Sequence, residues 1–569
     1  MQLSVSRSLA ALLCLTAIAA RGQSPGAPDT SRIAGPAEVS VAVDLGKPLG
    51  AYKPIGSWFG YDEIDYTFGK NGQQLLGELG KMSRVPVTVR AHHLLTSGDG
   101  EGRLKWSSTN VFTLGPDGKP VYDYTVLDKI FDVYHRDGIR PFVELGFMPK
   151  DLATGTMPYE QPYPNTVKGS VQSPPKDYKL WGELVQHVVA HFVERYGRAE
   201  VATWYFEVWN EPDISYWQGT QAEYFKLYDY SVAGVRRALP GAIVGGPGST
   251  GPGSERAQNF LRAFLEHCAN GKSAATGGPI PLDFISFHPK GSPRLVDGHV
   301  RMGLSNELHS AENGFRIVAA SGKWHNLPIV LSEADPEGCA ACSAKENPAN
   351  GYRNGTLYPT YTAAAMKALE DLAAENKVNL VGMITWAFEF EGRQYFEGFR
   401  TLATNGIDKP VLNVFRMAAF LNGERVAASS SGAVTADDIV QSGVRAEPDI
   451  DAFATKSAHD AAVMLWNYHD MDLPAPAAKV TVKISGIPAG VKRVRLEHFR
   501  IDETHSNAYT AWKAMGEPQQ PTAEQLEQLK EAGQLQLLDS PEWLTVEGGA
   551  VTVTTELSRQ ATGLLHLEW

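Results

Sequence analysis

Short apolar runs alternate with amphipathic stretches over most of the chain. Residues 85–90 and 139–145 are apolar runs of strand length. Residues 124–134 repeat apolar side chains at the spacing of one helix face, and 180–196 do so over a longer stretch. Strands followed by helices predict a parallel sheet, and about eight of them predict a (β/α)8 TIM barrel. Further strand-like runs occupy 204–208, 242–245, 284–287, 329–331 and 380–386, and an alanine-rich helix is expected over 360–376.

The pattern changes beyond about Gly423. Short alternating runs separated by turns indicate an appended C-terminal β-sandwich domain, interrupted by one polar helix over 522–532. The strand-like residues 38–43 precede the barrel and could join this sandwich. The expected division is a signal segment over 1–22, a leader and first strand over 23–46, a catalytic barrel over 47–422 and a β-sandwich over 423–569.

Composition and charge narrow the class of protein. The 569 residues are 43% hydrophobic and 20% charged, as in ordinary soluble globular proteins. The net charge of −12 argues against a nucleic-acid partner, which would require a basic face. Residues 1–22 have the features of a secretory signal, because Arg7 precedes an apolar stretch that ends in small residues. That stretch is too short to span a membrane, and Leu13 before Cys14 fits a lipoprotein cleavage site poorly. We therefore expect export to the periplasm or the extracellular medium without a membrane anchor. The sequence leaves the oligomeric state open.

Three cysteines remain once such a signal is removed. Cys339 and Cys342 are separated by two alanines, and Cys268 lies elsewhere. In an exported protein, a local disulfide that braces the loop would fit this spacing. Two free thiols are the alternative, and a metal site would need further ligands that are not obvious nearby.

Two glutamates carry the chemistry that the sequence suggests. Glu211 is part of the segment Trp209-Asn210-Glu211-Pro212, which follows the strand-like run 205–208. Glu333 ends the run 327–333. In a barrel both would lie at the carboxyl ends of strands and could face each other across the mouth. Glycosidic bond cleavage requires such a pair, one carboxyl protonated and the other ionised. The residues alone do not say which glutamate has which role.

Further side chains fall at the same ends of the predicted strands. Asn210 can bond a sugar hydroxyl, and Arg90 can keep a neighbouring carboxylate ionised. His92, His288 and Trp386 would line the same face, with the indole as an apolar floor for a sugar ring. Each has a structural alternative, as an ordinary ion pair or a satisfied core residue, but their agreement on one face favours a site. This chemistry implies no metal and no organic cofactor.

These motifs resemble those of glycoside hydrolase family 39, which contains β-xylosidases and α-L-iduronidases. The Asn-Glu-Pro motif alone is shared by a whole clan of barrels, whereas its combination with later segments is specific. The resemblance covers nearly the whole chain after the signal, is strongest to bacterial β-xylosidases, and implies a (β/α)8 barrel with a β-sandwich appended. The segments that carry it are 209–212, 284–288, 332–336, 405–410 and 499–509.

The resemblance also implies roles and an activity. Glu211 would be the acid/base and Glu333 the nucleophile of a retaining mechanism, with carboxylates about 5–5.5 Å apart. Asn210 would bind the 2-hydroxyl, and Arg90, His92 and His288 would line the −1 subsite. The expected activity is that of an exo-acting β-xylosidase on xylo-oligosaccharides. A non-catalytic carbohydrate-binding protein is the alternative from another class, and the intact pair of glutamates disfavours it.

Two cations bear on which sugar would enter the site. Lys290 and Arg400 follow predicted strand ends and resemble the iduronidase branch, where a lysine and an arginine meet the uronate carboxylate. Two cations in a desolvated pocket would favour a charged sugar. Acids crowd the segment around Arg400, so we expect internal neutralisation and place xylose ahead of a uronate. The acids proposed for this are Glu389, Glu391 and Glu397.

Overall fold

The computed structural model describes residues 37–104, 108–156, 170–386 and 388–569. The expected signal segment and most of the leader therefore lie outside the described residues. Among the helices of these segments, none combines the length and the hydropathy that a membrane crossing requires.

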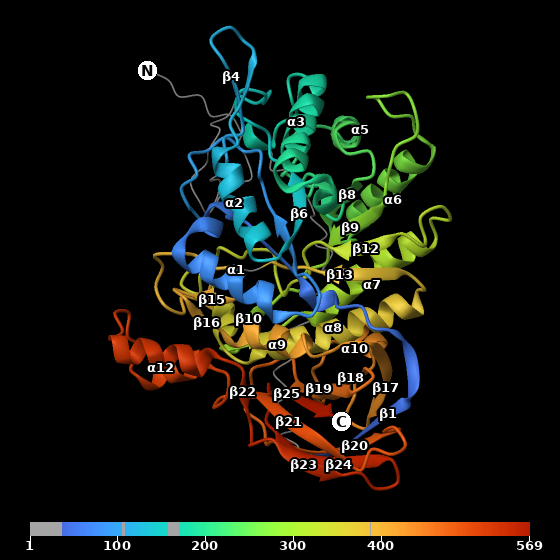
Figure 1. The fold of residues 1–569 in the computed structure, drawn as a ribbon, viewed down its shortest axis with the longest axis vertical. Helices are drawn as coiled ribbons and strands as arrows, with labels where there is room; N and C mark the ends of the chain where they lie inside the picture. The colour runs from blue at the N-terminus through green and yellow to red at the C-terminus, as the bar shows by residue number, and fades with distance from the viewer. Residues whose placement is uncertain (1–36, 105–107, 157–169, 387) are drawn as a thin grey trace, which may run out of the picture. The chain divides into compact units, whose positions relative to one another are not determined.

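A parallel sheet closes into a barrel, which confirms the expected fold class (Figure 1). Its last strand is interrupted at Ile384, so that β13 pairs with β12 while β14 pairs with β2 and completes the ring. The strand order within the described residues is β13-β12-β9-β8-β7-β6-β3-β2-β14. The bounds are β2 (Trp58–Tyr61), β3 (Thr88–Ala91), β6 (Arg140–Leu145), β7 (Tyr205–Val208), β8 (Ile243–Thr250), β9 (Phe284–His288), β12 (Pro328–Leu331), β13 (Asn379–Met383) and β14 (Thr385–Trp386).

A helix follows each barrel strand, and the buried face of each helix follows its apolar spacing. In α2, for example, Leu127, Ile130, Phe131 and Tyr134 are buried. A capping box between Thr220 and Glu223 fixes the start of α5. The barrel helices are α1 (Lys70–Met82), α2 (Thr125–Arg136), α3 (Tyr178–Tyr196), α5 (Gln221–Ala238), α6 (Glu255–Asn270), α7 (Leu304–Ala319), α8 (Leu357–Glu375) and α9 (Pro410–Ala418), with the short α4 (Arg198–Val201) after α3.

Aromatic side chains fill the inside of the barrel. Trp58 lies 5.3 Å from Tyr205, and Phe142 lies 5.4 Å from Phe284, measured between ring centroids. Gly382 makes room for this layer, because a Cβ there would lie 2.6 Å from the Trp58 ring. Full burial of each large side chain contributes about 1.5–3 kcal/mol. The inside of the barrel is therefore a packed core, and the polar side chains of the site gather at the carboxyl ends of the strands.

The second body is a mixed β-sheet, and β1 belongs to it rather than to the barrel. In Figure 1, β1 runs beside β17 and β20, with which it pairs. Because β1 extends to Ala51, the barrel begins later than the expected residue 47. The described strands are β1 (Glu38–Ala51), β17 (Glu424–Ser430), β18 (Asp449–Lys456), β19 (Asp460–Tyr468), β20 (Ala478–Ser485), β21 (Arg493–Ile501), β22 (Gln536–Leu537), β23 (Glu542–Thr545), β24 (Ala550–Leu557) and β25 (Thr562–Glu568).

This sheet folds into two layers that share one hydrophobic core. Only two residue pairs, Glu424 with Lys456 and Arg425 with Thr455, join β17 to β18, so the ladder connects the layers at a corner. Val41 and Val482 from one layer lie in the same core cluster as residues of the other layer. The opposite face of β19 packs against α8 and contributes to the barrel's core.

Smaller elements complete the described chain. The helix α12 (Ala523–Gly533) matches the expected polar helix, whereas α10 (Ala436–Ser442) and α11 (Ala508–Ala514) were not expected. Three hairpins were also not expected: β4 (Phe112–Leu114) with β5 (Pro120–Tyr122), β10 (Arg294–Val296) with β11 (His299–Arg301), and β15 (Ala403–Thr404) with β16 (Ile407–Asp408). Their strands have two or three residues each, which is too short for a periodic signal.

Candidate active site

Glu211 stands on a tight turn at the carboxyl end of β7. Trp209 and Glu211 have positive φ angles of 70° and 43°, a backbone region that non-glycine residues rarely adopt. The Trp209 Nε1–H donates to Tyr216 O at 2.9 Å, and the Glu211 N–H donates to Gly248 O at 2.7 Å. Strain of this kind costs on the order of 1–3 kcal/mol per residue and persists where surrounding contacts impose it. The turn therefore fixes the direction of the Glu211 carboxyl.

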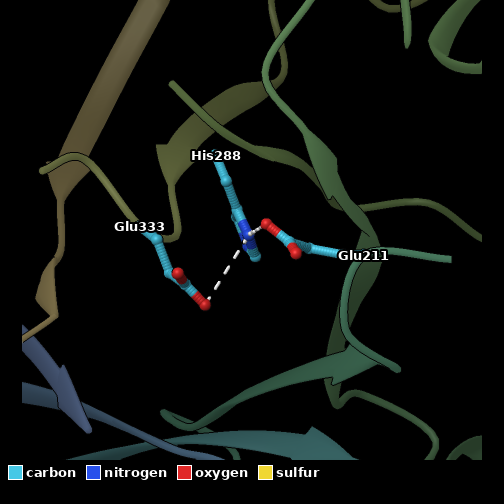
Figure 2. A group of neighbouring side chains, drawn as sticks. All are labelled: Glu211, His288 and Glu333. Atoms are coloured by element: carbon cyan, nitrogen blue, oxygen red, sulfur yellow. Dashed lines mark hydrogen bonds and ion pairs between the residues drawn. The ribbon is translucent and has the colours of Figure 1, made fainter. Parts of the chain in front are cut away.

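Glu333 follows β12 and faces Glu211 across the mouth of the barrel. One carboxyl oxygen of each glutamate and a ring nitrogen of His288 all lie within 4.8 Å of one another. Figure 2 shows the imidazole between the two carboxyl groups, with Nδ1 3.1 Å from Glu211 Oε1 and 3.6 Å from Glu333 Oε1. His288 Nε2 lies 3.0 Å from Ser332 Oγ. The two glutamates are thus close to the roughly 5–5.5 Å separation of retaining glycosidases, and too close to hold a water between them as inversion requires.

The surroundings of Glu333 keep it ionised. Burial alone would raise its pKa, but Lys290, His288 and Arg90 hold the pKa well below its usual range. Lys290 Nζ donates to Glu333 Oε2 at 2.7 Å, and Arg90 Nη1 donates to Oε1 at 3.0 Å. A buried carboxylate with two charged donors is suited to act as a nucleophile.

Arg90 lies at the centre of a buried acidic cluster. Its side chain is completely buried, with Nε 2.7 Å from Glu207 Oε2 and Nη2 2.9 Å from Glu144 Oε2. Nη2 also donates to Asn210 Oδ1 at 3.0 Å, which fixes the amide beside Glu211. Burial raises the pKa of Glu144 to about 7 despite the nearby cation of Arg90. Arg90 thus positions Asn210 and Glu333 together, as well as compensating the charge of the acids.

Lys290 and Arg400 are both neutralised by acids other than those expected. Lys290 Nζ lies 2.7 Å from Asp335 Oδ2 as well as from Glu333. Arg400 is completely buried, forms an ion pair with Asp335, and lies 2.7 Å from Glu337 Oε1 through Nε. The expectation that Glu389, Glu391 and Glu397 would compensate Arg400 is wrong. Glu389 accepts from the Gly406 N–H, Glu391 from the Asn71 N–H, and Glu397 pairs with Arg393.

His92 and Trp386 meet around a residue that the sequence did not single out, Asp62. The Trp386 Nε1–H donates to Asp62 Oδ1 at 3.0 Å, and His92 Nε2 lies 3.6 Å from the same oxygen. The indole also lies against Arg90, whose Cζ is 4.9 Å from the ring centroid. Trp386 is only 2% exposed, so its ring is wedged between protein groups and offers little open surface as a floor.

A cleft of about 520 Å³ opens beside Glu211. It is lined by the loop after β8, the first residues of α6 and α7, and Val440 of α10. Glu211, His288 and Lys290 also line it. The lining is mostly polar, with Arg256, Asn306 and His309 among its side chains. This cleft lies on the β7–β9 side of the barrel, away from Asp62 and Trp386.

Comparison with known proteins identifies the family. The model of "Glycosyl hydrolases family 39" matches residues 100–541, which is more than half of the chain. The chain belongs to glycosyl hydrolase family 39. The protein is therefore a glycoside hydrolase.

Relatives in the family differ in the sugar they act on. A beta-xylosidase of Caldicellulosiruptor saccharolyticus is 28% identical over 77% of this chain and 81% of its own length. An alpha-L-iduronidase of Mus musculus is 26% identical over 86% of this chain and 75% of its own length. A solved structure of a bacterial orthologue of human α-L-iduronidase has a TM-score of 0.73 at 20% identity and covers 94% of this chain and 84% of its own. The family is common to all of them, and the sugar is not.

For a family 39 enzyme, the cluster of Glu211, His288 and Glu333 is explained by covalent and proton-transfer chemistry. The same three side chains present ligand atoms that a metal ion could bridge. However, Lys290 and Arg90 already pair with Glu333, and their positive charges would oppose a bound cation. The cluster is thus better suited to acid–base and nucleophilic chemistry than to a bound cation.

The loop that contains Cys339 and Cys342 contacts Arg400 of this family 39 site. Cys339 and Cys342 form a disulfide, and Cys268 is a buried free thiol. Arg353 donates to the carbonyl oxygens of both disulfide cysteines at 2.7 Å, and the Arg400 N–H donates to Ala340 O at 3.0 Å. Of the alternatives that the sequence left open, the structure has the disulfide, and the loop it closes supports the backbone of Arg400.

Proposed function

We propose that the protein is an exo-acting, retaining β-xylosidase that releases terminal xylose from xylo-oligosaccharides. The observation that carries this proposal is the closeness of the Glu211 and Glu333 carboxyl groups around His288. Glu333 would attack the anomeric carbon while Glu211 gives its proton to the departing oxygen, which leaves an ester between the sugar and Glu333. Glu211 would then take a proton from water as the water oxygen attacks the same carbon, and both glutamates return to their starting forms.

The hydrogen bonds around His288 support this division of roles. The imidazole fixes the place of Glu211, because Nε2 lies 3.0 Å from Ser332 Oγ and Nδ1 lies 3.1 Å from Glu211 Oε1. Glu333, in contrast, has its pKa depressed by Lys290, His288 and Arg90 against the effect of burial. The ionised Glu333 is thus suited to be the nucleophile, which assigns the role of the acid to Glu211.

Charge pairing supports a neutral sugar over a uronate. Lys290 is shared by Glu333 and Asp335, and Arg400 by Asp335 and Glu337. Neither cation is left uncompensated, so a uronate carboxylate would have to displace an acid already in place. Xylose carries no charge and requires no such exchange.

The buried end of the site supports exo action. Asp62, His92 and Trp386 stand at the barrel mouth on the side away from the Glu211 cleft, and they are 9%, 3% and 2% exposed. A chain that continues into the cleft from the scissile bond would meet these buried residues at its other end. Only a terminal sugar would then fit beside Glu333.

The activity is tested with a panel of aryl glycosides. We expect turnover of aryl β-xyloside, with β-xylose as the first product seen by NMR, and no turnover by Glu333→Gln. Faster hydrolysis of aryl α-L-iduronide would replace xylose by a uronate in the proposal. Sugar binding without turnover of any glycoside would favour the carbohydrate-binding alternative.

We further propose that residues 1–22 direct export and are removed. An apolar stretch after Arg7 supports this. N-terminal sequencing of the protein recovered from a bacterial periplasm should begin close after residue 22. Retention of these residues in a cytoplasmic fraction would contradict the proposal.

A further inference from the structure

Asp62 presents an unused hydrogen-bond acceptor at the mouth of the barrel. It follows β2 at the strand's carboxyl end, which is the end that carries Glu211 and Glu333. Oδ1 accepts from Trp386 Nε1 at 3.0 Å. Oδ2 accepts no hydrogen bond from any residue in the described segments, and the side chain is only 11% exposed. Because this oxygen is not among the completely buried atoms, a donor from a bound molecule can reach it.

The position of the acid determines which part of a substrate would approach Asp62. Glu211 would protonate the departing oxygen, so the leaving group lies on its side, in the cleft of about 520 Å³ that Glu211 lines. The sugar bound to Glu333 must then extend the other way. In the barrel that direction leads to β2, β3 and β14, which carry Asp62, His92 and Trp386. Asp62 is thus on the glycone side of the scissile bond.

The surroundings of Asp62 hold its open oxygen in place. The Trp386 backbone N–H donates to Asp335 Oδ1 at 2.8 Å, which fixes the residue that anchors Asp62. Gly60 allows the indole to approach, because a Cβ there would lie 2.6 Å from the ring. The Trp386 ring in turn lies against Arg90, which bonds Glu333. A continuous set of contacts therefore sets the orientation of Asp62 relative to the nucleophile, as a pre-organised binding group requires.

We propose that Asp62 is a specificity-determining residue whose Oδ2 accepts a hydrogen bond from a hydroxyl of the glycone remote from the anomeric carbon. This inference rests on the proposed function. An ionised carboxylate can only accept hydrogen bonds, so it selects a free hydroxyl. It disfavours an esterified, sulfated or carboxylate-bearing position at the same point of the sugar. The ligand class is therefore a terminal sugar with an unsubstituted hydroxyl on its far side.

The test combines variants of Asp62 with aryl β-xylosides that lack the 3- or the 4-hydroxyl. A hydrogen bond to a charged group corresponds to about 10- to 150-fold in kcat/KM. In the wild type, one of the two deoxy substrates should show a loss of that size. In Asp62→Ala, kcat/KM for the parent substrate should fall by a similar factor. Removal of the same hydroxyl from the substrate should then lower kcat/KM of this variant only a little further. Asp62→Asn keeps the shape, and its deoxy loss should fall to the roughly 2- to 12-fold of a neutral bond.

Asp213→Asn is the matched control. Asp213 is buried beside the leaving-group side, where it pairs with Arg256 at 2.7 Å. That variant should keep the full deoxy loss of the wild type. If removal of the hydroxyl lowers kcat/KM of both Asp62 variants as much as it does in the wild type, this inference is overturned and the proposed function stands. If Asp62→Ala does not fold, the result for Asp62→Asn is used alone. If the wild type prefers another glycoside, the deoxy analogues of that sugar are used. Failure of the wild type on every glycoside would refute the proposed function and this inference together.

Discussion

Lys290 links Glu333, the proposed nucleophile, to Asp335, and Lys290→Met tests what it does there. The variant keeps most of the side-chain volume and removes the charge from a group that lies 2.7 Å from both Glu333 and Asp335. Removing one partner of a buried ion pair costs about 3–5 kcal/mol. Because Asp335 keeps Arg400 and Glu333 keeps Arg90, we expect a loss near the lower end, about 3 kcal/mol.

The sign of the pH effect follows from the depressed pKa of Glu333. Burial raises that pKa, but Lys290, His288 and Arg90 lower it by more than burial raises it. The stability that ionised Glu333 contributes is therefore present above its ordinary pKa and is lost as pH falls through the folded pKa. Without Lys290 the folded pKa rises. The acidic limb of kcat/KM should therefore move to higher pH, and the loss of Tm should be larger at pH 7 than at pH 4.

The assay is a pH profile of kcat/KM on an aryl glycoside that the wild type hydrolyses, with Tm measured in parallel. Lys367→Met is the control, because Lys367 Nζ also bridges two acids, at 2.8 Å from Asp371 and 3.0 Å from Asp451, but outside the site. It should lower Tm and leave the pH profile unchanged. The reasoning fails if Lys290→Met lowers Tm without moving the acidic limb. Loss of iduronide turnover alone, with xyloside hydrolysis intact, would instead make Lys290 a uronate-binding residue.

Two further predictions concern catalysis and stability. Glu333→Ala should abolish turnover of every glycoside, whereas Glu211→Ala should retain the first step on substrates with good leaving groups and be rescued by azide with retained configuration; reversed behaviour in kinetics and product NMR would exchange the roles. Burial raises the pKa of Glu389 to about 8, so its contribution to stability is full below its ordinary pKa and is lost as pH rises through about 8. Glu389→Gln should therefore raise Tm at pH 9 relative to the wild type and change it little at pH 5, and an equal change at both pH values would contradict the assignment.

The sequence placed Glu211 and Glu333 at the same face of the barrel, because an apolar run ends at each of them. Asp62 was not singled out, because Gly56, Ser57 and Gly60 interrupt the apolar run around β2 and leave no strand pattern. Glu144 and Glu207 could have been found from the sequence, because each is a single acidic residue inside an apolar strand. Their shared partner Arg90 comes from another strand, and only the closed barrel brings the three together.

The partners of Arg400 show where nearness in sequence misleads. Glu389, Glu391 and Glu397 were expected to neutralise it because they precede it by a few residues. Asp335 and Glu337, on the loop after another strand, do so instead. In a barrel, loops that are distant in sequence converge at the same face. Which charges pair there depends on which strands are neighbours in the barrel, and the order of residues in the sequence does not show this.

The place of β1 has a consequence for how the chain folds as it is synthesised. Glu38 and Lys479, at the start of the β1–β20 pairing, are 441 positions apart in sequence. At about 5–20 residues per second, the ribosome needs on the order of 20–90 s to make the intervening chain. During that time the entire barrel is made, and Val39, Val41 and Val43 have no strand to pair with until β17 follows at Glu424. β1 is an interior strand between β17 and β20, so the second domain cannot close until its earliest strand meets residues that are translated long after the barrel.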